Sequence, residues 1–426
     1  MKATAVIGAA FGDEGKGLVV DYLSAKDPLH TVVVRHNGGA QAGHTVVRPD
    51  GRRHSFSHIG SGTFAGAATY LARTFLVNPL LWRKERDELA KVNLLDPSGM
   101  NGGVEKTNGH GESHVALPTL YVDPAAVFTT PWDMIVNREL ERQRGSARHG
   151  SCGYGINETV TRSHTLPGHV GKAESPIWLR DFLRVARNYS EERFRVAGGA
   201  MTKDFLDRFL SEQVFEDFME AMAAFLKTAV LADGLPKKVG FDHVVFEGAQ
   251  GLLLDELHQF FPHVTRSRTG LPNVGTFTRC NQIPDVSVVY VMRAYMTRHG
   301  EGPFPTEDKA LSYPDATNAP NEFQGSLRFG RLDVPLIAAA IRKDLTGTQT
   351  DIGKTVLAVT HLDQVNELEE VGVREMLTAA TGFDVVFHCY GPCREDVANV
   401  TLSGTCRATM SRADVRRWST AGKVLA

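Results

Sequence analysis

Residues 8–17, Gly-Ala-Ala-Phe-Gly-Asp-Glu-Gly-Lys-Gly, combine the residue types that bind phosphate. They lie between a short apolar run at 3–7 and a helix-like segment at 18–24. A glycine-rich turn between a strand and a helix presents backbone N–H groups and the positive helix end to an anion. Lys16 adds a positive charge for the terminal phosphates of a nucleotide. The alternative interpretation is an ordinary glycine-rich turn with solvated charges.

Two departures from the common phosphate-binding loop are informative. More residues separate Gly8 from Gly15 than in the motif G-x-x-x-x-G-K-[ST], and Gly17 stands where that motif has its metal-binding hydroxyl. The turn contains Asp13 instead. A carboxylate beside a phosphate suits Mg²⁺ binding or proton transfer, so the loop predicts both functions in one place.

A second glycine-rich loop, residues 36–45, follows a β-branched run at 31–35 that is typical of a strand buried on both faces. The loop combines three glycines with Gln41 and His44. Glycine lets the backbone approach a ligand closely, so this composition suits an active-site loop better than a core. For His44 alone, a turn histidine hydrogen-bonded to the backbone is the alternative.

Polar residues also follow two later strand-like runs. Residues 247–251, Glu-Gly-Ala-Gln-Gly, come directly after the run at 243–246, and Asp363 comes after the run at 354–359. Open α/β sheets bind ligands at the carboxyl ends of their strands. A carboxylate at the position of Asp363 can pair with the N1–H and 2-amino edge of guanine. Small, hydroxyl and basic residues at 145–155 also suit an anion, with a surface loop as the alternative.

The composition excludes some classes of function. The chain has 426 residues, 42% of them hydrophobic and 23% charged, with a formal net charge of -2. This composition is that of a globular protein and provides no basic field for tracking nucleic acid. No apolar run approaches the ~18 residues of a membrane span, and the sequence starts with a strand-like run rather than a basic and apolar leader. We therefore expect a cytoplasmic protein with no nucleic-acid or membrane partner.

The order of strand-like and helix-like segments predicts an α/β fold. Their alternation implies a central, mostly parallel twisted sheet covered by helices on both faces. We expect a single domain over 1–426 with a mainly helical subregion at about 175–235, where a phenylalanine stripe at helical spacing indicates core packing. The strand-like runs are 3–7, 31–35, 68–77, 243–246, 286–294, 354–359 and 384–387, and the helix-like segments outside the subregion are 18–24, 79–92, 131–144 and 334–343.

Several of these segments together resemble the adenylosuccinate synthetase family of purine-pathway ligases. They occur in the family's order between residues 5 and 395, and several in register are far more specific than any one alone. The resemblance implies one adenylosuccinate synthetase-like domain with a P-loop-like, GTPase-related phosphate loop at its N-terminus. The matching segments are 11–17, 38–39, 42–45, 246–251, 253–255, 302–307, 321–323, 362–363, 391–392 and residue 394.

The family's reaction has two steps. GTP phosphorylates the 6-oxygen of IMP, and the amino group of L-aspartate then displaces that phosphate to give adenylosuccinate, GDP and phosphate. Positioning and neutralisation of charge are what phosphoryl transfer mainly requires. The resemblance therefore implies a GTP- and Mg²⁺-dependent ligase of purine nucleotide biosynthesis that forms a 6-phosphoryl-IMP intermediate.

The resemblance assigns catalytic roles to two residues. Asp13 corresponds to the family's base on the purine N1–H and also contacts Mg²⁺, for which the carbonyl of Gly43 is a further ligand. His44 corresponds to the acid that stabilises charge on the moving phosphoryl group. For GTP binding the matched positions are Gly12, Glu14, Gly15, Lys16, Gly17, Thr45, Asp363 and Gly391. For IMP binding they are Gln41, Ser151, Cys152, Gln250 and Thr265.

A homodimer is also implied, because Arg162 resembles an arginine that a second subunit contributes to the IMP phosphate. The chain departs from the family where the second substrate binds. Typical members carry there a Thr-Thr-Gly-Arg loop and further arginines that grip the carboxylates of aspartate. This chain has only a short loop at 324–331, in which Arg328, the substrate-binding candidate, and Arg331 remain. Elsewhere Leu18 replaces a lysine, Gln41 an asparagine, Cys152 a threonine, and His361 the lysine that covers the nucleotide base.

These departures leave alternatives open. A related ligase or phosphotransferase could act on another purine nucleotide or amine donor, or could use ATP or dATP. The short loop favours a kinase-like enzyme that keeps only the first half-reaction. A non-catalytic nucleotide-binding regulator is a further alternative, and the presence of both Asp13 and His44 counts against it.

Overall fold

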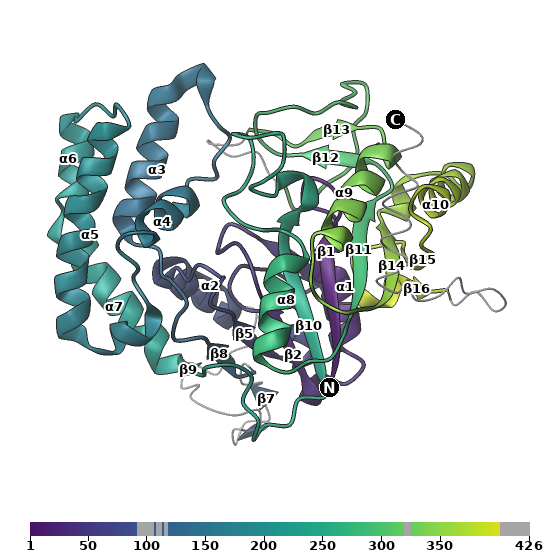
Figure 1. Cartoon of the computed structure of the whole chain (residues 1–426), viewed down its shortest axis with the longest axis horizontal. Coiled ribbons are helices and arrows are strands. Elements are labelled where there is room, and N and C mark those ends of the chain that lie inside the picture. Colours follow the sequence, from purple (N-terminus) through teal and green to yellow (C-terminus); the bar gives the residue numbers. More distant parts are fainter. Residues whose placement is uncertain (92–105, 108–112, 115–117, 319–324, 401–426) are drawn as a thin grey trace.

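The computed structural model describes residues 1–91, 106–107, 113–114, 118–318 and 325–400 (Figure 1). Its centre is a ten-stranded sheet in the order β16-β15-β14-β11-β1-β10-β2-β5-β8-β9. All neighbouring pairs in this sheet are parallel except β15 and β16, which confirms the predicted α/β fold. The strands are β1 (Lys2–Gly8), β2 (Thr31–Arg35), β5 (Ala68–Leu71), β8 (Leu120–Val122), β9 (Ala229–Leu231), β10 (His243–Gly251), β11 (Val286–Arg293), β14 (Ile352–Thr360), β15 (Val385–Cys389) and β16 (Val397–Asn399).

Helices cover both faces of the sheet. On one face, α8, α9 and α10 share an apolar core with Ile7 of β1. On the other face, α1 packs Val19 into a core with Val6 of β1, because successive side chains of a strand point to opposite faces. The helices outside the helical subregion are α1 (Lys16–Ser24), α2 (Pro79–Lys91), α3 (Pro131–Arg144), α4 (Ile156–Ser163), α8 (Leu271–Cys280), α9 (Val334–Thr346) and α10 (Glu367–Thr381).

The predicted helical subregion consists of α5 (Pro176–Val196), α6 (Lys203–Phe209) and α7 (Glu212–Thr228). Figure 1 shows these helices beside α3 at one side of the molecule. The phenylalanines of the stripe are buried in one apolar cluster, so they serve the core as predicted: Phe205, Phe209, Phe215, Phe218 and Phe225. The organisation of residues 1–426 as a single domain stays a prediction.

Strand β1 lies in the middle of the sheet, between β10 and β11. Since β2 and β14 run in the same direction, the carboxyl ends of all five strands meet at one edge. The sequence predicts a strand end at residue 246, but β10 continues to Gly251, with a register shift opposite the last residues of β1. Glu247 is therefore a buried strand residue rather than a loop residue. Among the described residues, no helix is long and apolar enough to cross a membrane.

Candidate active site

A cavity of about 560 Å³ lies at the carboxyl ends of these strands. A second cavity, of about 590 Å³, is lined by Tyr70, Arg73, Asn273 and other residues, none of them a predicted site residue. The first cavity therefore contains the candidate active site. Predicted site residues in its wall are Asp13, Glu14, Gly15, Lys16, Gly17, Gln41, Gly43, His44, Thr45, Gln250, Asp363 and Gly391.

The phosphate loop binds its own carboxylate in this structure. The backbone N–H groups of Ala10 and Gly12 donate to Glu14 Oε1 at 3.1 and 2.8 Å. The Lys16 ammonium donates to Glu14 Oε2 at 2.5 Å, and both side chains are buried. Lys16 thus lies in the cavity wall as predicted, but a phosphate that binds it has to share it with Glu14.

Asp13 is held in a strained conformation at the cavity. Its φ of 60° lies in the left-handed region that residues other than glycine rarely adopt. Gln250 and His361, with φ of 62° and 58°, also line the cavity. Such strain persists only where the surroundings determine it, and it concentrates at functional sites.

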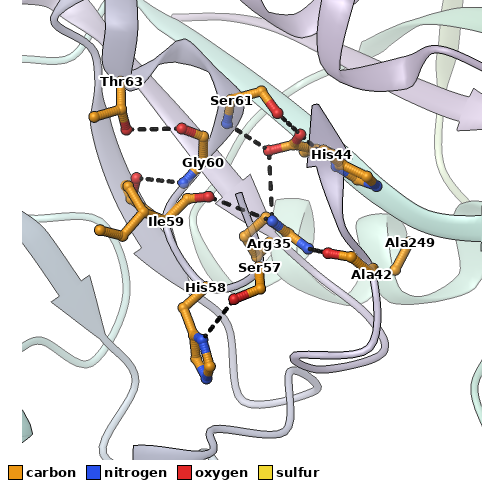
Figure 2. Close-up of polar contacts among 12 residues, drawn as sticks. Arg35, Ala42, His44, Ser57, His58, Ile59, Gly60, Ser61, Thr63 and Ala249 are labelled. Carbon is orange, nitrogen blue, oxygen red and sulfur yellow. Dashed lines mark hydrogen bonds and ion pairs between the residues drawn. The ribbon is translucent and has the colours of Figure 1, made fainter. Parts of the chain in front are cut away.

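His44 is the first residue of β3 (His44–Val47), which pairs with β4 (Arg53–Phe56). Its Nδ1 lies 2.5 Å from Glu247 Oε1 in the interior of the protein. Glu247 also accepts hydrogen bonds from the backbone and hydroxyl of Ser61, and the Arg35 guanidinium lies 4.0 Å away (Figure 2). Because the Glu247 carboxylate can only accept, the proton of the neutral His44 ring lies on Nδ1.

Burial and charge act in opposite directions on this pair. Burial alone would raise the pKa of Glu247, but His44, Arg35 and the Ser61 hydrogen bond outweigh it and lower that pKa to about 2. Burial lowers the pKa of His44 against the opposing effect of Glu247. The carboxylate is therefore ionised near neutral pH, and burial keeps the pKa of the imidazole below its usual 6.5 even beside that charge.

The far end of the cavity contains the predicted base-reading residues. Asp363 lies in a short 3₁₀ helix, Leu362–Gln364, directly after β14. Partial burial raises its pKa, and Gly391 lies in the same cavity wall. At His361, burial and then Arg293 lower the pKa to about 3, so this residue brings no positive charge to the base.

Two side chains in the cavity wall, Gln41 and Thr45, have no hydrogen-bond partner among the described residues. Both polar atoms of the Gln41 amide and the hydroxyl of Thr45 are buried without a hydrogen bond to any described residue. Buried polar groups are normally satisfied, so these two side chains mark places where a polar ligand fits.

Three predicted IMP residues lie outside the cavity wall. The Ser151 hydroxyl donates to Asn137 Oδ1 at 2.8 Å, and burial raises the pKa of the neighbouring Cys152 to about 11. Thr265 donates its backbone N–H to Leu254. The loops of Ser151 and Thr265 meet each other, since His263 Nδ1 lies 3.3 Å from the carbonyl oxygen of His149.

Arg162 makes its hydrogen bonds inside its own chain in this structure. Its guanidinium is fully buried in its own protomer and binds both carboxylate oxygens of Asp133, with distances of 2.9 to 3.1 Å. It also donates to the carbonyls of Leu166 and Phe128. The predicted role of Arg162 toward a second subunit stays a prediction.

Arg328 also lies away from the cavity. It is in β13 (Arg328–Gly330), where it donates to Glu307 Oε2 and to the carbonyl of Gly302, both at 2.9 Å. Arg331 pairs with Asp308 at the surface. Residues 319–324, including Gln324 and the motif at 321–323, lie outside the described residues, so the predicted donor site has no complete structural description.

Sequence reasoning missed several residues of the site, among them three charged ones in the cavity wall. Arg293 ends β11, and the rule that ligands bind at strand ends could have identified it. Arg53 and Asp315 line the cavity from the β3–β4 hairpin and from the segment 314–318, and neither has a motif that signals this.

The adenylosuccinate synthetase family model matches residues 5–382. The chain belongs to the adenylosuccinate synthetase family. Adenylosuccinate synthetase from Halothermothrix orenii is 30% identical over 395 residues, covering 86% of this chain and 79% of that protein. The enzyme from Thermoplasma acidophilum is 29% identical over 403 residues, covering 90% and 81%. These proteins are ligases that form C–N bonds in purine biosynthesis.

Two solved structures share the fold. Fully ligated adenylosuccinate synthetase from Plasmodium falciparum superposes with a TM-score of 0.64 at 16% identity, covering 94% of this chain and all of that one. Succinoaminodeoxyadenylate synthetase from cyanophage S-2L, bound to dGMP and dATP, gives a TM-score of 0.56 at 16% identity, covering 99% of both chains. At such identity the likeness concerns the fold alone.

Proposed function

We propose that this protein is a GTP- and Mg²⁺-dependent ligase that joins IMP and L-aspartate to give adenylosuccinate, GDP and phosphate. One observation carries the proposal: Asp13 and the Glu247-bound His44 line the same cavity as the phosphate loop. Membership in the family supports the same reaction.

In the first step, the Asp13 carboxylate takes the N1 proton of IMP, and the released electron pair makes O6 the nucleophile. O6 attacks the γ-phosphorus of GTP, whose bond to the bridging oxygen breaks to give GDP and 6-phosphoryl-IMP. Negative charge on the transferring phosphoryl group favours uptake of a proton from solvent by His44 Nε2. The Nε2–H then donates to a phosphoryl oxygen, while Nδ1 stays bound to Glu247. In the second step, the neutral amino nitrogen of aspartate attacks C6, phosphate leaves with the C6–O electron pair, and the nitrogen releases one proton to solvent.

The residues of the cavity fit Mg²⁺. Among the described residues, the Asp13 carboxylate forms an ion pair only with His299, whose Nε2 lies 3.6 Å away, and the charge of Arg293 acts on it without forming an ion pair. Mg²⁺ commonly takes one or two protein ligands and fills its shell with water and phosphate oxygens. The Asp13 carboxylate and the Gly43 carbonyl would hold the ion, which when bound neutralises charge on the nucleotide phosphates.

A second candidate is a related ligase or phosphotransferase with another nucleotide or amine donor. It is favoured by the uncharged His361 at the base end and by the position of Arg328 outside the cavity. The cyanophage relative was solved with dGMP and with dATP as energy donor, so such variation exists within the fold. A non-catalytic regulator is disfavoured, because Asp13 and the His44–Glu247 pair are both present.

We further propose a cytoplasmic homodimer. With Arg162 buried in its own protomer, the support for a dimer is the family resemblance alone. Sedimentation velocity checks it directly: a fully active monomer would remove the dimer, and a dimer that dissociates with loss of activity would support a shared site.

A substrate matrix tests the proposed reaction. GTP, ATP and dATP are combined with IMP, GMP and dGMP and with aspartate or other amines, and products are identified by mass spectrometry. We expect adenylosuccinate and phosphate only when GTP, IMP and aspartate are present together. Phosphate release without an amine would identify a phosphotransferase, and another product mass would identify another substrate pair.

The matched variant is Asp13→Asn, which keeps the size of the side chain but cannot take a proton. We expect a fall in turnover on the order of 10³-fold, within the range for loss of a general base. Nucleotide turnover that is unchanged in this variant would favour the regulator.

A further inference from the structure

Arg293 joins three segments of the cavity wall. It is buried at the carboxyl end of β11, directly beside the end of β1. Its Nε donates to the carbonyl of Asp13 at 2.6 Å, and a terminal nitrogen donates to Asp315 Oδ2 at 2.9 Å. Its other terminal nitrogen donates to the hydroxyl of Tyr295 at 3.2 Å. All three nitrogens of the guanidinium are thus engaged.

The contact with Asp13 acts on the strained residue itself. A left-handed φ of 60° at an aspartate is retained only when surrounding groups fix it. The bond from Arg293 fixes the carbonyl of that residue and hence the direction of its carboxylate. Among the described residues the carboxylate forms an ion pair only with His299, whose Nε2 lies 3.6 Å away, and the charge of Arg293 also attracts it. Arg293 therefore acts on both the backbone and the carboxylate of Asp13.

The contact with Asp315 fixes the opposite wall. Asp315 also accepts hydrogen bonds from the backbone N–H groups of Thr317 and Asn318, so it orders the segment 314–318 that lines the cavity. Tyr295 extends the network, because its hydroxyl donates to the side chain of Gln364, which follows Asp363 in the chain. Its ring stacks on that of Tyr313, with 3.9 Å between the ring centroids.

We infer that Arg293 is a positioning residue that sets the conformation of Asp13 and of the wall segment 314–318. Lysine keeps the charge, but its single nitrogen cannot make three divergent bonds. Arg293→Lys should therefore release both segments, whereas Asp315→Asn should release only the wall and leave the bond to Asp13.

Hydrogen exchange in the ligand-free protein tests the inference without assuming any substrate. In Arg293→Lys we expect faster exchange both at residues 12–16 and at 314–318. In Asp315→Asn we expect it at 314–318 only. Unchanged exchange at residues 12–16 in Arg293→Lys would overturn the inference, whatever reaction the protein catalyses. Arg180→Lys, in an exposed ion pair with Glu216, is the control and should change neither segment.

Kinetics provide a second readout, which rests on the proposed function. A displacement of about 1 Å at a catalytic group can lower the rate ~10²-fold, so we expect kcat of Arg293→Lys to fall 10- to 100-fold. Asp315→Asn should mainly raise the KM for a nucleotide and keep kcat within about threefold. Equal losses of kcat in both variants would show that Arg293 acts only through the wall, which overturns its role toward Asp13.

If the lysine variant does not fold, Arg293→Met combined with Asp315→Asn removes both buried charges together, which avoids leaving one unpaired. Its exchange at residues 12–16 decides the same question. If wild-type protein shows no turnover in the substrate matrix, the proposed function fails while the exchange result still decides the role of Arg293.

Discussion

Buried histidine–glutamate pairs lie in two places in the described part of the chain: His44–Glu247 in the candidate active site and His58–Glu85 outside the cavity wall, where His54 Nε2 is a second neighbour of Glu85 at 3.7 Å. His44 Nδ1 lies 2.5 Å from Glu247, and His58 Nδ1 lies 3.2 Å from Glu85. In each pair a serine donates both its backbone N–H and its hydroxyl to the carboxylate, Ser61 in one and Ser57 in the other. Figure 2 shows both histidines with their serines.

The pairs differ at the second ring nitrogen. His58 Nε2 accepts a hydrogen bond from the backbone of Asn78 at 3.0 Å, so both of its nitrogens are used inside the protein. His44 lines the cavity, and no described residue is a hydrogen-bond partner of its Nε2. A buried histidine–glutamate pair is therefore a candidate for catalysis only when one nitrogen remains for a substrate.

The largest effect is expected from removing that free nitrogen. In His44→Asn the amide can still donate to Glu247, but nothing replaces Nε2. We expect kcat to fall on the order of 10³-fold with a small change in melting temperature, because general acid–base groups contribute about 10² to 10⁴. Steady-state kinetics at saturating substrates measure it.

His58→Asn is the matched variant in the other pair. It should lower the melting temperature and keep kcat of the folded protein within about threefold, since its effect is a lost buried hydrogen bond. Near-normal kcat in His44→Asn, or a large loss in His58→Asn, would break the distinction between the pairs.

A smaller loss is expected from Glu247→Gln. The neutral amide no longer favours one protonation state of His44, and Arg35 loses its buried counter-ion. Partners that orient a metal-binding histidine contribute about 10- to 100-fold, and we expect a fall in kcat of comparable size for a histidine oriented in the same way. Thermal melting run in parallel measures the accompanying loss of stability; an unchanged kcat would show that His44 acts without Glu247.

Glu85→Gln should affect folding alone. Burial opposes ionisation of Glu85, but His54 Nε2 at 3.7 Å and hydrogen bonds from His58 and Ser57 hold its pKa well below the usual 4.5. A depressed pKa contributes stability that is present above pH 4.5 and is lost as the pH falls below it. We expect the variant to lose about 2–3 kcal/mol at pH 7, the contribution of hydrogen bonds to a buried charge.

Urea unfolding of both proteins at pH 7 and at pH 3.5 checks this. The difference in stability between wild type and Glu85→Gln should shrink at the lower pH, while kcat at pH 7 stays unchanged. Glu247 also has a lowered pKa, but it is present in both proteins, so its contribution to the pH dependence cancels in the difference. A constant difference across this pH range would rule out ionised Glu85 as the source.

Much of the fold and the centre of the site followed from sequence patterns. The β-branched runs of β2, β11 and β14 predict buried parallel strands, whose carboxyl ends must meet, and this brings Asp13, His44 and Asp363 to one cavity. The partner of His44 was not predictable in this way. Because Glu247 directly follows an apolar run, the sequence predicts a loop residue there. Its burial depends instead on the pairing of β10 with β1 and β2, which the local sequence does not show.

Arg162 shows a limit of another kind. Its residue type and its place in the chain match the family, but Asp133, which lies 29 residues earlier, determines where its side chain goes. A resemblance between sequences shows the order and the types of the residues. It does not show where a long side chain points in the folded chain.

The smallest expected effects on stability and kcat come from the two serines that bind the carboxylates, Ser61 and Ser57. In Ser61→Ala and Ser57→Ala the hydroxyl is lost, but the backbone N–H still donates to the same carboxylate. Each variant should lose about 1 kcal/mol of stability, the net contribution of one hydrogen bond, as measured by urea unfolding. Only Ser61→Ala should also lower kcat, by about threefold, because Glu247 orients a nitrogen that meets substrate and Glu85 does not. Equal kcat in the two variants would mean that a hydroxyl on the carboxylate matters for folding alone, and that His44 is oriented by Glu247 without help from Ser61.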